Sequence, residues 1–154
     1  MKRHALLPVL LLFLAVTLTP ALAQHASCPV GGFSLTLPDT FSDRGTSSSD
    51  PDLCFFWKGN KLTIQGYASY LGEVAGSDLF EVLTGSETES GMVKVNGMQM
   101  LYAAGTDSGG AYVMYSWMDR GNNVTLYFYY KEGDSSARDW VGKIMRTISF
   151  DAGH

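Results

Sequence analysis

Histidine is scarce in this 154-residue sequence, and its positions leave little room for catalysis by an imidazole. There are three histidines: His4 follows the basic start of the chain, and His25 and His154 lie near the ends of the remainder. Chain ends are the least firmly held parts of a domain. Because a general base is most often a histidine, we expect neither a Ser-His-Asp nor a Cys-His centre and assign no catalytic residue.

Basic side chains are also few. Without Lys2 and Arg3, which belong to an N-terminal segment described below, nine Lys and Arg remain against fifteen Asp and Glu, a formal net charge of −6. A surface that neutralises phosphate groups needs clustered Lys and Arg. Nucleic acid and anionic membrane surfaces are therefore not expected as partners.

Cys28 and Cys54 are the only cysteines, so no CxxC motif exists. A metal site or a redox pair is the alternative to a disulfide, and His25 is the only imidazole near enough in sequence to support one. We predict a structural disulfide between the two cysteines. The loop that it closes has about 27 residues, worth about 3.5 kcal/mol in the chain-entropy model.

Motifs for cofactors are missing as well. The stretch "GTDSGGAY", residues 105–112, is rich in glycine, but no Lys follows it, and it predicts a hairpin rather than a phosphate loop. The closest acidic pairs, Asp50 with Asp52 and Glu87 with Glu89, supply too few oxygens for a specific calcium loop. We interpret both pairs as parts of solvated polar loops and predict no cofactor and no metal.

The longest apolar run lies at the N-terminus, where "MKRH" precedes "ALLPVLLLFLAVTLTPALA". A basic start, an apolar middle and the small residues Ala21 and Ala23 are typical of a secretory signal, here residues 1–23. An uncleaved membrane anchor is the alternative, and Pro8 and Pro20 count against it. We expect a periplasmic or secreted protein with no stable membrane insertion after cleavage.

The remaining length suits one domain with one core. We expect an N-terminal segment over residues 24–32, a single α+β domain over 33–150 and a C-terminal tail over 151–154. Alternating apolar residues predict a strand in "FSLTL" and two more in "CFFWKGNKLTIQGYASYL", joined by a turn at "GN".

Two helices are expected. Ser77 as N-cap and Gly85 as a stop predict a short helix in "GSDLFEVLTG". Nearer the C-terminus, Ser136 and Asp139 form a start like a capping box. The apolar residues that follow recur with helical spacing: Ala137, Trp140, Val141, Ile144 and Ile148. They predict an amphipathic helix, and "TISF" after it predicts a short last strand.

Three turn sequences set the pairing of four strands between residues 93 and 130: "VNGM", "TDSGGA" and "DRGNNV". The first is a strong signal for a type I′ hairpin, and the other two predict looser ones. The expected opposite pairs are Val95 with Met98, Thr106 with Ala111 and Asp119 with Val124. Because opposite residues share a face of the sheet, these pairings divide the side chains into two sets.

One of these faces is almost purely apolar, and we expect it to be core. Its residues are Val93, Val95, Met98, Met100, Tyr102, Ala104, Val113, Tyr115, Trp117, Val124, Leu126, Phe128 and Tyr130. The other face is mixed, with large adaptable residues at Tyr112, Met114, Met118, Tyr127 and Tyr129. Tyr and Met are common at binding surfaces, so these five form the candidate binding face. Alternatively, the short helix near residues 79–83 covers them and they form a second, minor core.

The order of these elements resembles the PsbP-like fold. The resemblance rests on "FSLTLPDTF" at 33–41, "VKVNGMQMLY" at 93–102 and "IMRTISF" at 144–150. The fold is shared by the extrinsic photosystem II protein, a eukaryotic Ran-binding import factor and bacterial DcrB-like exported proteins. It implies an α+β protein whose antiparallel β-sheet of about six to seven strands is flanked by a short helix and a C-terminal amphipathic helix. No motif here transfers the ion sites of the photosynthetic members.

The resemblance also implies a non-enzymatic role. We expect an exported binding or accessory protein that acts through contact with a protein partner in the bacterial envelope. The alternative is an exported inhibitor or immunity protein against an envelope toxin, which would use acidic loops such as "SDPD" and "GSETES". A carboxylate-based hydrolase is a more remote alternative.

Overall fold

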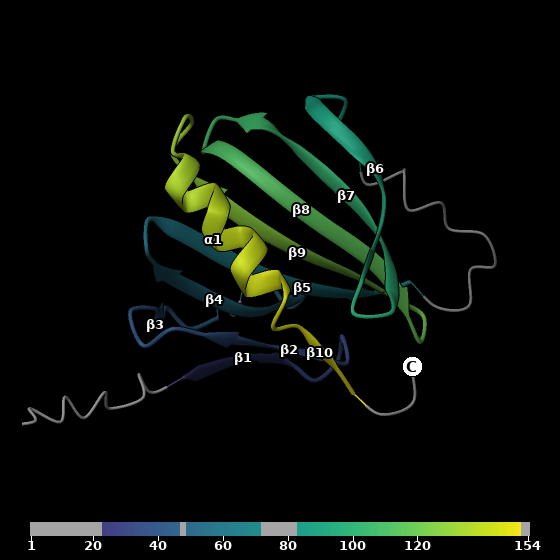
Figure 1. The fold of residues 1–154 in the computed structure, drawn as a ribbon. Coiled ribbons are helices and arrows are strands. Elements are labelled where there is room, and N and C mark those ends of the chain that lie inside the picture. The colour runs from purple at the N-terminus through teal and green to yellow at the C-terminus, as the bar shows by residue number, and fades with distance from the viewer. Residues whose placement is uncertain (1–22, 47–48, 72–82, 152–154) are drawn as a thin grey trace, which may run out of the picture.

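The computed structural model describes residues 23–46, 49–71 and 83–151, and its largest element is an antiparallel sheet of seven strands (Figure 1). In order across the sheet the strands are β3 (Ser42–Asp43), β4 (Leu53–Gly59), β5 (Leu62–Tyr70), β9 (Asn122–Tyr130), β8 (Gly110–Asp119), β7 (Met98–Asp107) and β6 (Glu87–Val95). The hairpins β6–β7, β7–β8 and β8–β9 connect neighbours, whereas β5 pairs with the distant β9.

A second antiparallel sheet packs against one face of the first (Figure 1). Its strands are β1 (Gln24–Cys28), β2 (Phe33–Leu37) and β10 (Ser149–Phe150), with β2 in the middle. The large sheet therefore has the expected number of strands, whereas the second sheet was not expected, and most of the expected N-terminal segment 24–32 is strand. In β1 only Ala26 and Cys28 are buried, and two apolar residues are too short a pattern to predict a strand.

The predicted disulfide between Cys28 and Cys54 is confirmed. It connects β1 to β4 and so ties the small sheet to the large one, with the two Cα atoms 5.2 Å apart. Cys28 is fully buried and Cys54 is partly exposed. A disulfide is compatible with a protein that works outside the cytoplasm.

One helix, α1 (Ser135–Met145), lies across the same face as the small sheet (Figure 1). Its N-cap is Asp134, whose carboxylate accepts a hydrogen bond of 3.0 Å from the backbone N–H of Ala137. The expected start at Ser136 is therefore wrong by two residues. Asp134 is favoured because Gly133 before it has a positive φ of 80°, which turns the chain into the helix.

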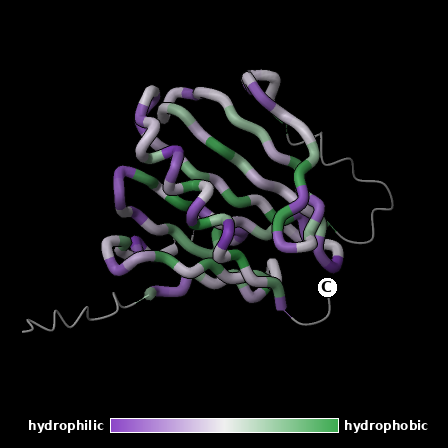
Figure 2. Tube along the Cα trace, in the orientation of Figure 1, coloured by the Kyte–Doolittle hydropathy of each residue, from purple (hydrophilic) through white to green (hydrophobic). Residues whose placement is uncertain are grey.

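The main core lies between the seven-stranded sheet on one side and α1 with the small sheet on the other. Of the thirteen residues of the apolar face predicted from the sequence, eight belong to this buried cluster and five are partly buried and pack against it. Aromatic edges connect the layers: Phe33 of β2 lies 5.8 Å from Phe55 and 5.0 Å from Trp117, measured between ring centroids. The hydropathy of the chain follows this arrangement, with apolar residues concentrated along the central strands (Figure 2).

The predicted registers are confirmed in two hairpins and wrong in the third. Val95 is opposite Met98 and Thr106 is opposite Ala111, as expected. Asp119 is opposite Asn122 instead of Val124, because Arg120 and Gly121 alone form a tight turn with positive φ angles of 45° and 79°. The error is two residues, so every side chain keeps its predicted face.

The β4–β5 turn also differs by one residue from the expected "GN". Asn60 and Lys61 form it, with φ angles of 48° and 63°, and Gly59 is still paired with Leu62. Glycine is required at position 59 by close packing and not by the turn, since a Cβ there would lie 2.7 Å from the Cα of Phe41.

Several predictions fall wholly or mostly outside the described residues. The signal over 1–23 and the tail over 151–154 are almost entirely outside them, and so is most of the short helix that begins at Ser77. Within the described ranges, no helix combines the length and the apolar character that a membrane crossing requires.

Candidate functional site

The structure places the candidate binding face on the side of the large sheet opposite α1. Tyr112, Met114 and Met118 come from β8, and Tyr127 and Tyr129 come from β9. Register brings four of them together, because Tyr112 is opposite Tyr129 and Met114 is opposite Tyr127. Met118 lies farther along β8, opposite Asn123, and does not line the pocket that the other four share.

Two of the four are buried. Tyr112 is 6% exposed and Met114 is 2% exposed, and they form a minor core with Leu101 and Ala103 of β7. Leu83, Tyr127 and Tyr129 are partly buried against this cluster. This face therefore combines a small second core with a partly open row of tyrosines on β9.

A pocket of about 200 Å³ opens beside these tyrosines. Tyr112, Met114, Tyr127 and Tyr129 form its apolar wall. Its polar wall comes from Thr84 and Ser86 just before β6, Glu87 at the start of β6 and Asp107 at the end of β7. We refer to this cavity as the tyrosine pocket.

The tyrosine rings are arranged by strand geometry. Tyr127 and Tyr129 are two residues apart on one strand, so they project from the same face, and their rings stack with centroids 5.6 Å apart at 16°. Tyr112 lies 6.3 Å from Tyr127 and 6.2 Å from Tyr129, inclined to both. Tyr67 of β5 meets Tyr127 edge to face at 6.1 Å. The sequence does not predict Tyr67 at this site, because the β5–β9 pairing is not local.

Glu87, predicted to be part of a solvated polar loop, is instead a main residue of the site. Its carboxylate accepts hydrogen bonds from the backbone N–H groups of Thr84 and Gly85, both at 2.7 Å, and from the Thr84 hydroxyl at 2.9 Å. The Tyr112 hydroxyl donates a further bond at 3.3 Å. The bonds from Thr84 and Gly85, above all the one from the Thr84 backbone, lower the pKa of Glu87 from 4.5 to about 2. Glu87 is a fixed anion that organises the pocket, not a solvated loop residue.

A Glu87→Gln variant is expected to lose about 1 kcal/mol of stability at neutral pH, because charge-assisted bonds to two backbone donors are weakened. Because its pKa is lowered, the ionised Glu87 carboxylate stabilises the fold. This contribution is fully present above about pH 4.5, the usual glutamate pKa, and is lost as the pH falls towards about 2. Urea unfolding measured between these limits should show a steeper dependence of stability on pH in the wild type than in the variant.

The matched control is Glu132→Gln, which removes an exposed carboxylate outside the pocket. It should leave the Glu87 contribution in place. A ¹³C NMR titration should place the Glu87 midpoint near pH 2. A midpoint at the ordinary glutamate value would contradict the hydrogen-bonded arrangement.

The other acidic group of the pocket, Asp107, is held by the β7–β8 turn. Its Oδ1 atom accepts a hydrogen bond of 2.7 Å from the backbone N–H of Gly109. Burial raises the pKa of Tyr129 to about 12, with Tyr127 and then Asp107 adding to the effect. Burial also raises the pKa of Tyr127, and Glu87 and Asp107 contribute. The tyrosines thus stay neutral in a negative field.

This arrangement suits recognition better than acid–base chemistry. A general acid or base works best with a pKa near the working pH, and the pKa of Glu87 is about 2. Across residues 23–46, 49–71 and 83–151, no three His, Cys, Asp or Glu side chains lie close enough together to hold a metal ion. What the pocket offers is aromatic surface beside fixed negative charge.

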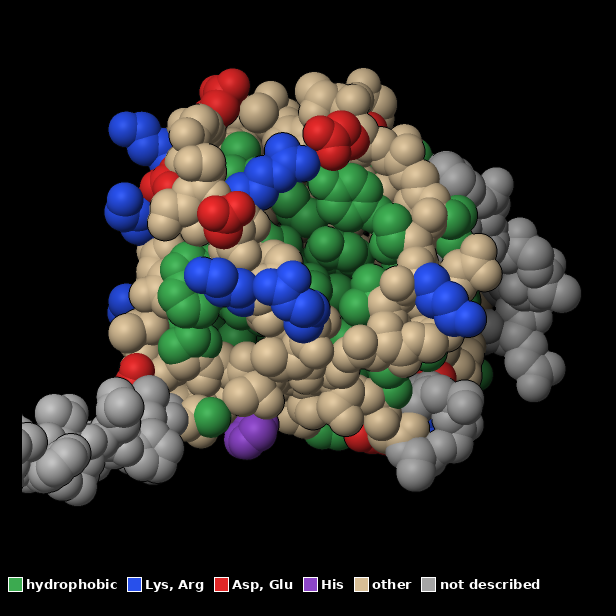
Figure 3. Space-filling model, in the orientation of Figure 1, with side chains coloured by type: hydrophobic (Ala, Val, Ile, Leu, Met, Phe, Trp, Pro, Cys, Tyr) green, Lys and Arg blue, Asp and Glu red, His purple; other side chains and the backbone are tan. Residues whose placement is uncertain are grey.

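A second exposed apolar area lies on the opposite face, between α1 and the β6 edge (Figure 3). Five residues of the predicted core are only partly buried here: Val93, Val95, Met98, Tyr102 and Tyr115. The eleven-residue α1 is about 16 Å long at about 1.5 Å per residue. It contacts β2 and β9 and leaves β6 and β7 largely uncovered.

Polar contacts bridge this area at its two ends. Arg138 of α1 donates to the Glu89 carboxylate of β6 at 3.1 Å and to the Tyr102 hydroxyl at 3.2 Å. At the other end, the Asn96 side chain donates to the backbone oxygens of Arg146 and Ile148 at 3.3 and 2.8 Å. Glu89, like Glu87, is therefore engaged within the fold.

No protein-family model matches the sequence, and no curated protein matches it. Among solved structures, the solution structure of cyanobacterial PsbP (CyanoP) from Synechocystis sp. PCC 6803 is similar, with a TM-score of 0.62 and 10% identity. The match covers 87% of this chain and 95% of that one. A crystal structure from Bacteroides thetaiotaomicron VPI-5482 has a TM-score of 0.56 and 14% identity, over 84% of this chain and 48% of the other. The resemblance to the PsbP-like fold is confirmed, and at such identities it concerns the fold alone.

Proposed function

We propose that this chain is an exported, non-enzymatic binding or accessory protein that acts through contact with a protein partner. We place it in the periplasm or outside the cell of a bacterium, among the DcrB-like exported proteins. The disulfide supports an oxidising compartment. The observation that carries the proposal is the tyrosine pocket, where aromatic side chains and fixed carboxylates meet at a partly open surface.

Tyrosine is well suited to such a role. Its ring supplies a large contact area at a low cost in conformational entropy, and its hydroxyl gives direction. Tyr127 and Tyr129 are partly exposed and are held in place by stacking on each other and by contact with Tyr112. A rigid, partly exposed aromatic pair of this kind is typical of residues that dominate binding energy.

The structure gives less support to the alternative of an inhibitor or immunity protein that binds through acidic loops. In "GSETES", both glutamates are engaged within the fold, Glu87 by Thr84 and Gly85 and Glu89 by Arg138. In "SDPD", Asp52 accepts a hydrogen bond of 2.7 Å from the Ser69 hydroxyl. These carboxylates are held against their own chain, so neither stretch is a free acidic loop, although the charge of Glu87 still lines the tyrosine pocket.

Affinity capture from the envelope fraction of the producing cell tests the proposal. The mature wild type should recover a partner, and the Tyr127→Ala, Tyr129→Ala double variant should recover about tenfold less, as expected when hot-spot residues are removed. Tyr70→Ala is the matched control, because Tyr70 is 73% exposed and does not line the pocket. Equal recovery by the double variant and the control would contradict a role for the pocket in protein contact.

A further inference from the structure

We infer that the tyrosine pocket binds a cationic side chain of the partner, a lysine ammonium or an arginine guanidinium. This inference deepens the proposed function and depends on it for the source of the cation. It rests on three observations: the aromatic wall, the charge of the polar wall and the size of the cavity.

The aromatic wall brings three tyrosine rings together around one small space. Tyr112, Tyr127 and Tyr129 all line the pocket, and each lies within 6.3 Å of the other two. The face of an aromatic ring carries partial negative charge and attracts a cation within about 6 Å of the ring centroid. Several rings converging on one cavity is the arrangement by which proteins recognise ammonium groups.

The polar wall carries negative charge only. Glu87 and Asp107 line the cavity, and none of the described residues lining it is Lys or Arg. Glu87 already has its carboxylate fixed by Thr84 and Gly85, so its charge is held in place before any ligand arrives. A cation entering the pocket would meet attraction from both walls, whereas an anionic ligand would be repelled by the carboxylates.

The volume points to a single side chain. About 200 Å³ is below the range of roughly 300–1,000 Å³ typical of pockets for drug-sized molecules. A water molecule occupies roughly 30 Å³, so the cavity has room for only a few groups of that size. That is enough for the end of one long side chain. The remainder of the chain is acidic as well, with a formal net charge of −6 once residues 1–23 are left out, so a basic partner is favoured over the whole surface.

The decisive experiment titrates the mature protein with small probes by NMR and follows the ring signals of Tyr127 and Tyr129. The probes are the Nα-acetyl N-methylamides of lysine, of arginine and of Nε-acetyl-lysine. The lysine or arginine probe should shift both signals in a saturable way, and the neutral acetylated probe should not. The stronger of the two cations identifies which side chain the partner supplies.

Substitutions in each wall test whether the carboxylates and the tyrosine rings both contribute to cation binding. Asp107→Asn keeps the Oδ1 acceptor for Gly109 and removes the charge, so it should weaken cation binding while the fold is retained. Tyr129→Leu should weaken it about two- to fivefold, the effect of one exposed cation–π contact. Tyr129→Phe keeps the ring and should bind nearly as well as the wild type. Circular dichroism confirms that each variant is folded.

The outcomes separate this inference from the proposed function. Equal shifts with charged and neutral lysine probes, or no shift with either cation, would overturn the cation site even if tyrosine-dependent capture of a partner succeeds. Cation binding that depends on Asp107 and Tyr129 supports the site. If capture then proves independent of the tyrosines, protein contact through the pocket fails and the cation site remains.

Discussion

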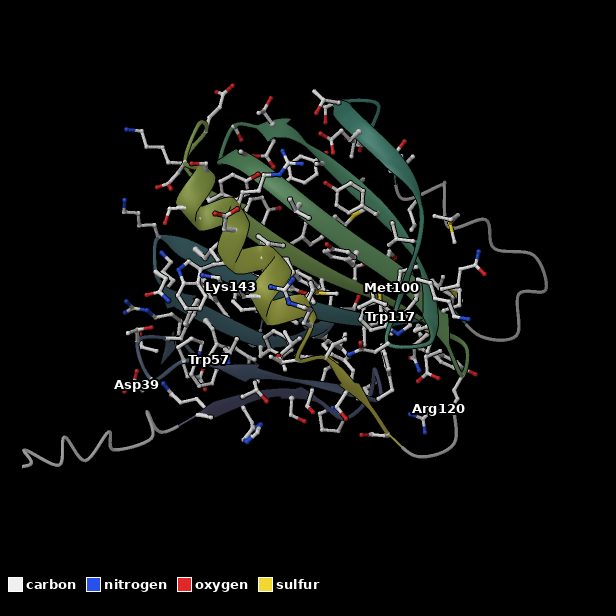
Figure 4. The ribbon with its side chains drawn as sticks, in the orientation of Figure 1. Asp39, Trp57, Met100, Trp117, Arg120 and Lys143 are labelled. Carbon is white, nitrogen blue, oxygen red and sulfur yellow. A yellow bond between two sulfur atoms is a disulfide. The ribbon has the colours of Figure 1, made fainter. Side chains whose placement is uncertain are left out.

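Replacing Trp117 with Ala is expected to lower the free energy of unfolding by about 3–5 kcal/mol, the usual effect of deleting a buried aromatic side chain. Trp117 is fully buried near the end of β8 and belongs to the same core cluster as Met100 (Figure 4). Its ring meets Phe33 of β2 at 5.0 Å and Phe150 of β10 at 5.9 Å, so it joins the two sheets. Because domains are stable by only about 5–15 kcal/mol, this variant should lose a large fraction of the stability of the domain.

Urea unfolding followed by circular dichroism measures this loss. Trp140→Ala is the matched control, since Trp140 lies on α1, is only partly buried and has the Lys143 ammonium 4.6 Å from its ring centre. Removing that contact and the exposed ring should cost about 1 kcal/mol. Similar losses in the two variants would show that the sheets are not held together at Trp117.

Reduction of the Cys28–Cys54 disulfide is the second large effect. We expect it to lower the free energy of unfolding by about 3.5 kcal/mol, because the unfolded chain regains the freedom that the closed loop denies it. The bond also connects β1 to β4, so the edge of the small sheet should separate more readily from the large one. The partly exposed Cys54 gives a reductant access to the bond.

Guanidinium unfolding with and without dithiothreitol measures the effect. The Cys28→Ser, Cys54→Ser double variant serves as the control, since its stability should match that of the reduced wild type and should not respond to the reductant. A change below about 1 kcal/mol would mean that the unfolded chain is already constrained between β1 and β4.

The faces of the four central strands could be predicted from the sequence, and so could most of their registers. Asn96-Gly97 demands a two-residue turn, which sets Val95 opposite Met98. Even the wrong register at Asp119 left the faces intact, because an error of two residues preserves the alternation. Turn chemistry and alternation act over a few neighbouring residues, so they can be read without knowledge of the rest of the chain.

The candidate site was predicted in part. Four of the five residues on the candidate face line one pocket, because register on β8 and β9 is local information. Glu87 was not expected there, since its role depends on a turn at Thr84 and Gly85 that returns to the carboxylate. Tyr67 reaches Tyr127 only through the pairing of β5 with the distant β9.

The sequence by itself determined which side chains share a face, which cysteines pair and which classes of chemistry lack their residues. Only the tertiary structure decided how each face is covered. The small sheet and α1 cover one part of the apolar face and leave Tyr102 and Tyr115 near the β6 edge partly open. On the other face, the same β8–β9 register buries Met114 and leaves Tyr127 beside a pocket. Coverage depends on where distant elements pack, and no local pattern records that.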